Sequence, residues 1–324
     1  MGSATAILQL TQAKGLGPVT LDRLLQRTIE LGFSVEDVVA ASISELTETF
    51  GLRQPVAEAV KTSRDEACRL SDELAAKDVR VLVRNRDGYP TKLSKTLGDR
   101  APLVLFARGN LALLEQPAVG FCGSRKTSER GLEVARDCAA MLAERQIDVV
   151  SGYANGTDLA AHRGALAAGG TTTLVMAEGI LNFRKKRELA EIWDRDRLLV
   201  LSEFSPKARW VARNAMTRNW TIAGLSGAMV LVESGMTGGT FAAGETTLEL
   251  NLPLFVVEYA DPPVSAEANR WFLDRGAIAL RRRPSDLKPN LDRLFEMLKP
   301  QPDSKPQSNA ASSTETAAQL QLNL

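Results

Sequence analysis

The sequence predicts an α/β fold in which a small N-terminal helical domain precedes a doubly wound, mostly parallel sheet. The main observation is a regular series of short apolar runs, each separated from the next by a segment of helix length. The second is that the first 75 residues show helical patterns with almost no strand pattern. We therefore divide the chain into a helical domain at residues 1–74, a sheet domain at 75–298 and a tail at 299–324.

The helical domain contains a pattern typical of a helix-hairpin-helix (SAM-like) unit. Gly15, Gly17 and Pro18 precede a helical pattern that includes Leu21 and Leu24, and the N–H groups of such a hairpin can approach a nucleic-acid phosphate. Residues 1–75 carry seven Lys/Arg against eleven Asp/Glu, however. Because this balance disfavours strong DNA contact, we favour a structural or protein-contacting role for the helical domain.

Eight apolar runs predict the strands of the sheet. The connection between parallel strands is a right-handed crossover, so the loops after these strands should emerge at one edge and face one crevice. Open α/β sheets bind their ligands in that crevice. We predict strands at residues 79–83, 103–106, 118–122, 147–150, 172–177, 198–201, 228–232 and 254–257.

Two consecutive loops at this edge have the chemistry of an anion site. A helix that begins near Ser128 directs unpaired N–H groups at the crevice, and Arg125 adds a planar fork that grips phosphate with two bonds. We expect Arg125 to matter more than any other single side chain. The alternative is that the glycines only make tight turns and that Arg125 is a solvated surface charge. The candidate binding residues are Gly123, Ser124, Arg125 and Lys126 in the first loop and Ser151, Gly152, Asn155 and Gly156 in the second.

Basic charge is concentrated in one later stretch. Residues 181–220 carry ten Lys/Arg against five Asp/Glu, in a chain whose formal net charge is +1. Lys185 and Lys186 follow the strand at 172–177, and Arg218 and Asn219 precede the strand at 228–232, so all four are candidates for a phosphate track. Charge runs are also typical of solvated helix faces, and that alternative stays open for residues 184–187.

The end of the chain offers little to a binding site. Arg281, Arg282 and Arg283 stand before Pro284, which predicts a surface turn away from the carboxyl edge of the sheet. The alternative is that these arginines contact the same polyanion. From about Pro300 the composition turns to Gln, Ser, Pro, Ala, Asn and Thr, which predicts a disordered tail.

The rare residue types exclude several classes of function. A single histidine, His162, allows no multi-histidine metal site, and its helical pattern predicts a packed, structural role in place of a Ser–His pair. Cys68, Cys122 and Cys138 lie far apart within apolar patterns, which indicates reduced thiols. No secretory signal pattern and no apolar stretch of membrane-spanning length is present. We expect a cytoplasmic protein with no membrane contact, no metal and no cofactor.

An ordered set of motifs resembles the DprA/Smf family of DNA-processing proteins. The resemblance covers roughly residues 10 to 280, and seven motifs in the order of the family are a specific match. They are Tyr89-Pro90 with Leu93, Arg108-Gly109, Gly123-Ser124-Arg125, Ser151 to Asp158, Ala161-His162, Arg218-Asn219 with Ile222 to Ser226, and Val232-Glu233 through Glu245.

The resemblance implies a Rossmann-like domain that binds single-stranded DNA, loads the RecA recombinase and protects incoming DNA during natural transformation. It also implies a homodimer and no catalytic residues. The family's DNA pocket carries over to Arg125 and, with less support, to Lys185, Lys186 and Arg218. Where the family has Arg-Asn-Arg, this chain has Arg218-Asn219-Trp220, which replaces a cation with an aromatic ring.

An enzyme is the competing class. The same wider superfamily contains nucleotide-cleaving phosphoribohydrolases of the Lonely-guy type, which use an arginine, a glycine-rich loop and a following glutamate. Gly238-Gly239 with Glu245 is similar, but the spacing of the enzyme motif is not reproduced because residues 240–244 intervene. A nucleotide-binding or nucleotide-cleaving protein is therefore the alternative to DNA binding.

Overall fold

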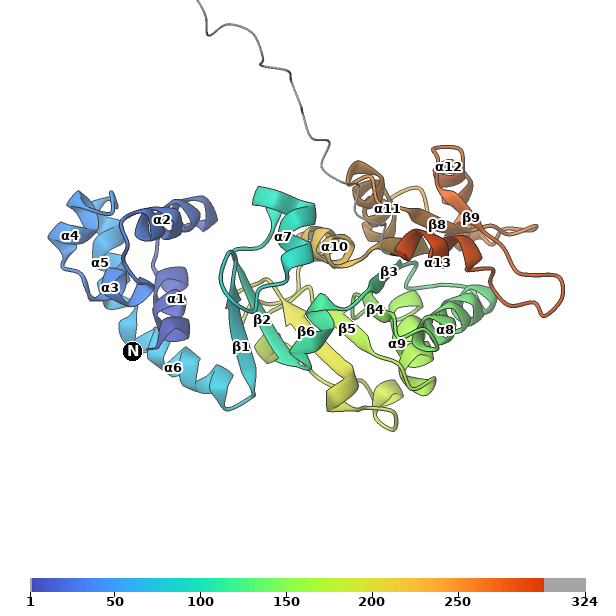
Figure 1. The fold of residues 1–324 in the computed structure, drawn as a ribbon, viewed down its shortest axis with the longest axis horizontal. Helices are drawn as coiled ribbons and strands as arrows, with labels where there is room; N and C mark the ends of the chain where they lie inside the picture. The colour runs from blue at the N-terminus through green and yellow to red at the C-terminus, as the bar shows by residue number, and fades with distance from the viewer. Residues whose placement is uncertain (1, 300–324) are drawn as a thin grey trace, which may run out of the picture.

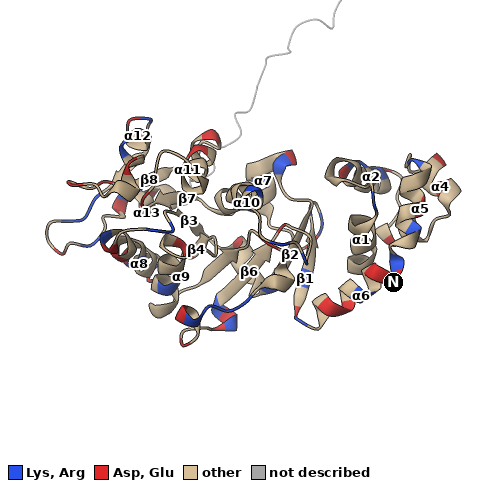
Figure 2. Cartoon of the chain, turned by 180° about the vertical axis from the view of Figure 1, so that it is seen from behind, with Lys and Arg blue, Asp and Glu red and all other residues tan. Residues whose placement is uncertain are grey.

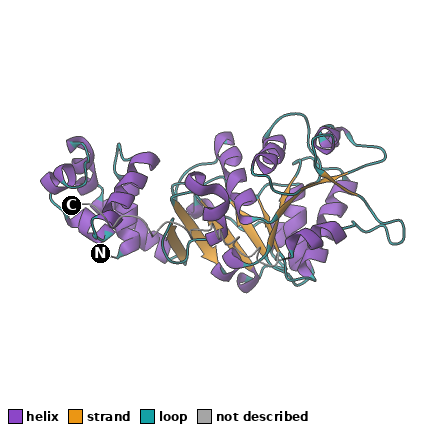
Figure 3. Cartoon of the chain, turned by 45° about the horizontal axis from the view of Figure 1, so that its top comes forward, coloured by secondary structure: helices purple, strands orange, loops and turns teal. Residues whose placement is uncertain are grey.

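The computed structural model describes residues 2–299 and shows one nine-stranded sheet with helices on both faces (Figures 1 and 3). The strand order is β1-β2-β6-β5-β4-β3-β7-β8-β9. The predicted fold class is confirmed, as are all eight predicted strands. The strands are β1 Val79–Val83, β2 Val104–Gly109, β3 Ala118–Cys122, β4 Asp148–Ser151, β5 Thr172–Val175, β6 Leu198–Ser202, β7 Ala228–Leu231, β8 Leu254–Val257 and β9 Ile278–Leu280.

The sheet is parallel from β6 to β9, whereas β1 and β2 are antiparallel additions at one edge. Strand β3 has β4 on one side and β7 on the other, so the chain reverses its direction of travel across the sheet at β3. Ligand crevices of doubly wound sheets open at the carboxyl ends of the strands at such a reversal. The loops after β3, β4 and β7 are therefore the place to look for a site.

Alternate side chains of β3 belong to two of the three buried apolar clusters found within residues 2–299. Val119 and Phe121 of β3 pack with α8 (Glu129–Ala143), α9 (Thr157–Ala167) and α13 (Asp292–Leu298) on one face. Cys122 packs on the other face, where the helices are α7 Thr91–Leu97, α10 Ala212–Leu225, α11 Gly239–Glu249 and α12 Asn269–Leu273. Burial of both faces explains the short apolar runs of the sequence.

The N-terminal part consists of six helices, whose buried side chains form the third cluster together with residues of β1, β2, β5 and β6. Leu70 and Leu74 belong to the same buried cluster as Val79 and Val104, so the two parts share a core. The division of the chain at residue 74 stays a prediction. The helices are α1 Ser3–Gln12, α2 Pro18–Glu30, α3 Val35–Ala40, α4 Ile43–Glu48, α5 Gln54–Thr62 and α6 Arg64–Ala75.

One partly buried ion pair links the helices to the sheet. Arg84, which directly follows β1, is 8% exposed and donates to Asp22 Oδ1 of α2 at 2.6 Å. Its Nη1 also donates to the backbone oxygens of Asp99 (2.9 Å) and Ala101 (3.0 Å). Within residues 2–299, Arg84 is therefore the only side chain that donates to these three oxygens.

We expect Arg84→Met to lower the free energy of unfolding by about 3 kcal/mol, because it leaves a carboxylate and two carbonyls without their donor. Urea unfolding followed by circular dichroism measures this loss. Arg86→Met is the matched control, since the Arg86 side chain makes no hydrogen bond or ion pair with another described residue. Equal losses in the two variants would contradict the anchoring role.

Strand β9 was not predicted, and its presence corrects one expectation. Because β9 runs parallel to β8, Arg281 stands at the carboxyl edge of the sheet, and the prediction that it lies away from this edge is wrong. It is nevertheless ion-paired with Glu258, and β9 is three strands from β3 in the sheet order.

The predicted disordered tail, apart from Lys299, lies outside the described residues. Among residues 2–299, no helix combines the length and the apolar character that a bilayer span requires.

Candidate functional site

Loops from three neighbouring strands meet α10 around a cavity of about 270 Å³ at the carboxyl edge of the sheet. A second cavity of about 400 Å³ adjoins it, and Arg125 and Arg218 line both. We call the two cavities together the crevice. Of the predicted binding residues, Gly123, Ser124, Arg125, Asn155, Arg218 and Asn219 line it.

The loop after β3 is held by its neighbours and leaves one hydroxyl free. Ser124 N donates to Glu233 O at 2.8 Å, and Ser124 Oγ accepts from Lys126 N at 3.0 Å. Thr127 donates to Ser124 O and shares a 2.7 Å hydrogen bond with Thr157 of α9. Among residues 2–299 the Ser124 hydroxyl proton has no acceptor, so it is available to an anion in the crevice.

Glu233 fixes the helix that begins behind this loop. It is fully buried, and its carboxylate accepts from Ser128 N (2.9 Å), Ser128 Oγ (2.5 Å), Tyr259 OH (2.9 Å) and Ser265 Oγ (2.6 Å). Ser128 Oγ in turn accepts from Gly131 N and caps α8. The predicted start of this helix is confirmed. The expectation that its unpaired N–H groups face the crevice is wrong, because Ser128 N and Gly131 N are already bonded within the protein and the first turn of α8 lines neither cavity.

The loop after β4 is shaped by a buried hydrogen-bond network. Ser151 Oγ lies 2.8 Å from Phe121 O and 2.9 Å from Asp158 Oδ1, and Ala154 N donates to Asp158 Oδ2 at 3.1 Å. Ser151 is fully buried and its hydroxyl is used inside the protein, so it positions the loop. Its contact with a ligand stays a prediction.

His162 lies beneath the same loop. It is fully buried, and its ring nitrogens lie 2.6 Å from Thr172 Oγ1 and 2.7 Å from Gly152 O. Burial lowers the pKa of His162 to about 4, so the ring is neutral near pH 7 and Nε2–H donates to the Gly152 carbonyl. The packed role predicted for His162 is confirmed.

Two glycines of this loop are required by close approach. A Cβ on Gly152 would lie 1.8 Å from Arg218 Nη1, and a Cβ on Gly156, where φ is +80°, would lie 2.4 Å from Ser124 O. The first glycine makes room for a guanidinium group, and the second brings the two loops together. Both glycines shape the crevice, and their role as ligand contacts stays a prediction.

Arg218 is a buried cation without a partner. It is 9% exposed, and its guanidinium makes no hydrogen bond or ion pair with any residue in 2–299. Its Nε is buried and unsatisfied. Burial lowers the pKa of Arg218, against the opposing attraction of Asp158 and Glu203. An anion in the crevice would supply the missing partner of this costly buried charge.

Asn219, the neighbour of Arg218, is used to hold the helices around the crevice. Its Nδ2 donates to Gly239 O at 2.9 Å, which links α10 to the first turn of α11. Glu203 lies behind Arg218, accepts from Thr221 Oγ1 at 2.9 Å, and has a pKa raised to about 7 by burial. Glu203 lines neither cavity, so the crevice contains the fixed cation, and the Glu203 carboxyl acts on that cation from outside the crevice.

Arg125 and two aromatic rings form the mouth of the crevice. Arg125 is exposed, and its guanidinium carbon lies 5.3 Å from the centroid of the Trp210 ring. Trp210 is 47% exposed, and Tyr153 lines the same cavity. Neither ring was among the predicted binding residues. The sequence does contain a pattern that could have identified them, because Trp210 stands within a predicted basic segment and Tyr153 within a predicted glycine-rich loop.

The two predicted lysines separate in the structure. Lys186 Nζ donates to Asn155 Oδ1 at 2.8 Å and lies 4.7 Å from the Tyr153 ring centroid, beside the crevice. Lys185 Nζ instead lies 5.8 Å from the Trp193 ring and borders another groove. Lys126 is exposed and lines neither cavity of the crevice.

Only part of the motif of the alternative enzyme borders this crevice, where Gly239 lines the first cavity. Glu245, the glutamate of the phosphoribohydrolase alternative, is exposed on α11 and lines neither cavity. Within the described residues, no three His, Cys, Asp or Glu side chains gather as a metal site requires.

Comparison with known proteins identifies the family. Residues 80–288 match the family model of the DNA recombination-mediator protein A. The chain is 35% identical over 173 residues to DNA processing protein DprA of Streptococcus pneumoniae, covering 53% of this chain and 60% of that protein. It is 30% identical over 206 residues to protein Smf of Escherichia coli, covering 63% and 54%. The match thus spans 60% or less of the length of each of these two relatives.

The fold also resembles solved structures of DNA processing proteins. The crystal structure of DNA processing protein A from Streptococcus pneumoniae superposes with a TM-score of 0.70 and 25% identity, covering 86% of this chain and 94% of that one. DNA processing protein A from Helicobacter pylori, whose structure concerns its single-stranded DNA binding mode, gives a TM-score of 0.53 at 22% identity, covering 62% and 90%. From its motifs, its fold and these matches, the chain belongs to the DNA recombination-mediator protein A family, the DprA/Smf family that its sequence resembles.

Proposed function

We propose that the chain binds single-stranded DNA in the crevice and delivers it to the RecA recombinase, protecting incoming DNA in recombination and natural transformation. The observation that carries this proposal is Arg218, a cation that is buried and unpartnered at the bottom of an open crevice. A strand phosphate satisfies it with charge-assisted hydrogen bonds.

The crevice also contains what a strand needs beyond one charge. Ser124 offers its hydroxyl proton, and Arg125 offers a second guanidinium at the mouth. The faces of Trp210 and Tyr153 border the second cavity. Aromatic faces are available to bases only when those bases are unpaired, so this arrangement favours single strands over duplexes and shows no basis for sequence preference.

Binding should fall steeply with salt. If Arg125, Lys126, Lys186 and Arg218 each neutralise one phosphate, the logarithm of the association constant should fall with the logarithm of the salt concentration with a slope of about −3. Gel-shift titrations with single-stranded oligothymidylate at a series of salt concentrations measure the slope. A flat salt dependence, or tighter binding of a duplex of equal length, would contradict the proposal.

Binding should also weaken as the pH rises through neutrality. The pKa of Glu203 is raised to about 7, so its carboxyl is mostly neutral at pH 6 and mostly charged at pH 8. The charged form attracts Arg218 and repels a phosphate, which should lower affinity by about threefold to tenfold across this range. Glu203→Gln should bind with little change between pH 6 and pH 8. A parent protein as insensitive to pH as this variant would refute the coupling.

The partner proteins are proposed on the family relationship. We propose a homodimer and a RecA contact on a surface outside the crevice. The expected results are a dimer mass by light scattering and faster RecA filament assembly on single strands in the presence of the chain. A nucleotide-cleaving activity remains the competing proposal, and release of free base from nucleoside monophosphates would support it.

A further inference from the structure

A second groove lies across the segment 183–197 from the crevice. It has a volume of about 780 Å³, within the range of small-molecule sites, which is roughly 300–1,000 Å³. One wall is formed by Arg80 of β1 and Arg108 of β2, and the other by Lys185, Trp193 and Arg195 of the segment. We call it the β2 groove. Figure 2 shows basic residues on the segment below β6 that forms the second wall.

The β2 groove has an excess of unpaired positive charge. Five cations line it, against the two carboxylates of Asp78 and Asp196. Arg195 is paired with Asp78 at 3.8 Å, and the fifth cation, Arg184, donates to Phe183 O. The remaining three, Arg80, Arg108 and Lys185, make no hydrogen bond or ion pair through their side chains with any described residue.

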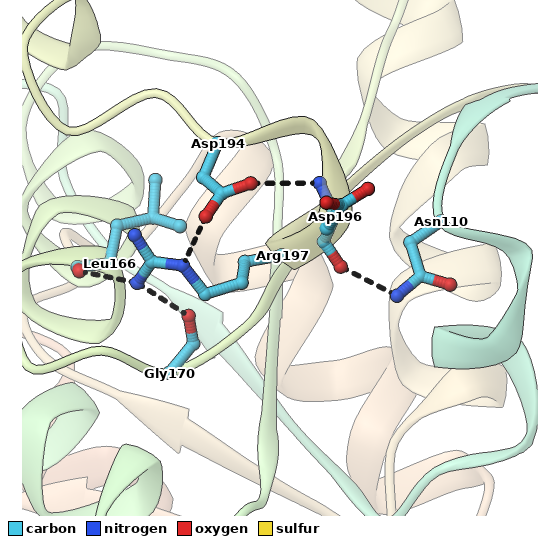
Figure 4. Close-up of polar contacts among 6 residues, drawn as sticks. All are labelled: Asn110, Leu166, Gly170, Asp194, Asp196 and Arg197. Carbon is cyan, nitrogen blue, oxygen red and sulfur yellow. Dashed lines mark hydrogen bonds and ion pairs between the residues drawn. The ribbon is translucent and has the colours of Figure 1, made fainter.

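The turn that carries Trp193 and Arg195 is held in place. Arg197 Nε donates to Asp194 Oδ2 at 2.8 Å and Nη1 to Leu166 O at 3.0 Å, which ties the turn to the end of α9 (Figure 4). Asn110 Nδ2 donates to Asp196 O at 2.6 Å, which ties the same turn to the segment after β2. The wall of the groove is therefore fixed before any ligand arrives, and a preorganised site loses less entropy on binding.

A row of aromatic rings connects the β2 groove to the crevice. Tyr153 lines the crevice, and its ring centroid lies 5.5 Å from that of Phe183. Phe183 lies 5.6 Å from Trp193, and both of these rings line the groove. Tyr153 OH accepts from Lys186 N at 2.8 Å, and it lies 3.2 Å from Arg184 O, within hydrogen-bonding distance. Phe183 is buried in the apolar core, so it packs against the rings of Tyr153 and Trp193, which line the crevice and the groove.

We propose that the β2 groove holds a second stretch of the same single strand that the crevice binds, with phosphates on Arg80, Arg108 and Lys185 and a base against Trp193. This inference rests on the proposed function. Interleaved cations and aromatic faces are the chemistry of single-strand tracks. An acidic peptide would use the cations but would have no flat group to place on the ring.

The test compares oligothymidylates of about 4 and about 16 nucleotides, which bracket the usual site sizes of single-strand modules. The variant is Arg80→Gln with Arg108→Gln, which removes two charges and keeps most of each side chain. The control is Arg275→Gln with Arg293→Gln, two exposed cations near the β9 end of the sheet. Equal melting temperatures establish that both variants are folded.

The groove variant should bind the longer strand about tenfold more weakly than the parent, while its affinity for the shorter strand stays within about twofold. The control variant should match the parent on both strands. Equal effects on the two strands, or no effect on either, would overturn the inference. The inference would also be overturned if the groove variant lost binding of dTMP or of oligoglutamate but bound the longer strand as the parent does. Either result would assign the groove to another ligand. A parent that binds neither strand would instead contradict the proposed function itself.

Discussion

Arg218→Met should weaken binding of single-stranded oligothymidylate by about 100-fold, an effect on the order of 3 kcal/mol. Arg218 is fixed by burial, borders both cavities of the crevice and has no partner among the described residues. A phosphate that loses this contact has no other buried donor at the bottom of the crevice. Fluorescence anisotropy with a labelled strand measures the loss.

The same substitution should leave the free protein as stable as the parent, or more stable by about 1–3 kcal/mol. A buried charge without a partner destabilises the folded state, and methionine fills similar space without a charge. Urea unfolding of the two proteins gives the difference. Opposite effects on binding and stability indicate a cation kept for a ligand, whereas a variant that unfolds at lower urea but binds normally would show that Arg218 is structural.

Arg125→Ala should weaken binding by on the order of tenfold to a hundredfold, since each charge-assisted hydrogen bond to phosphate contributes roughly 1.5–3 kcal/mol. Arg125 is exposed, but it borders both cavities and stacks near Trp210. Arg125→Lys should recover only part of the affinity, because an ammonium group has neither the planar fork nor the stacking face. Anisotropy titrations at one salt concentration compare the three proteins.

Arg281→Ala is the control for this series. Arg281 also lies at the carboxyl edge of the sheet, but it is paired with Glu258 on the far strands. Its loss should change affinity by less than about twofold. An Arg125→Ala protein that binds as tightly as the parent, with weakened binding in Arg281→Ala, would place the strand at the other end of the sheet.

Most of the sheet could be predicted because its strands are buried on both faces and read as short apolar runs. Strand β9 was missed for the opposite reason. It has only three residues at the edge of the sheet, and just one of them, Leu280, is buried. An edge strand needs few apolar side chains, so its pattern is short and its pairing is decided by the neighbouring strand.

The loops of the crevice were predictable from local chemistry, but the burial of Arg218 was not. The sequence places Arg218 among other basic residues, and only the packing of α10 against Gly152 removes it from water. Because of this packing, we expect substitution of Arg218, and not of Arg125, to have the largest effect on binding.

Adjacent residues in the basic stretch also have different neighbours. The backbone at Lys186 is extended, and side chains alternate along an extended chain. Lys186 therefore faces Tyr153 while Lys185 faces Trp193. A count of charges along the sequence cannot assign these two lysines to two sites.

The most direct test of the central claim is a crystal structure of the chain with bound oligothymidylate, and the quantity to measure is the distance from Arg218 to the nearest phosphate oxygen. We predict a phosphate oxygen within about 3 Å of the Arg218 guanidinium, with Arg125 on the same or the adjacent phosphate. A strand bound elsewhere on the protein, with Arg218 still unpartnered in the crevice, would contradict the account.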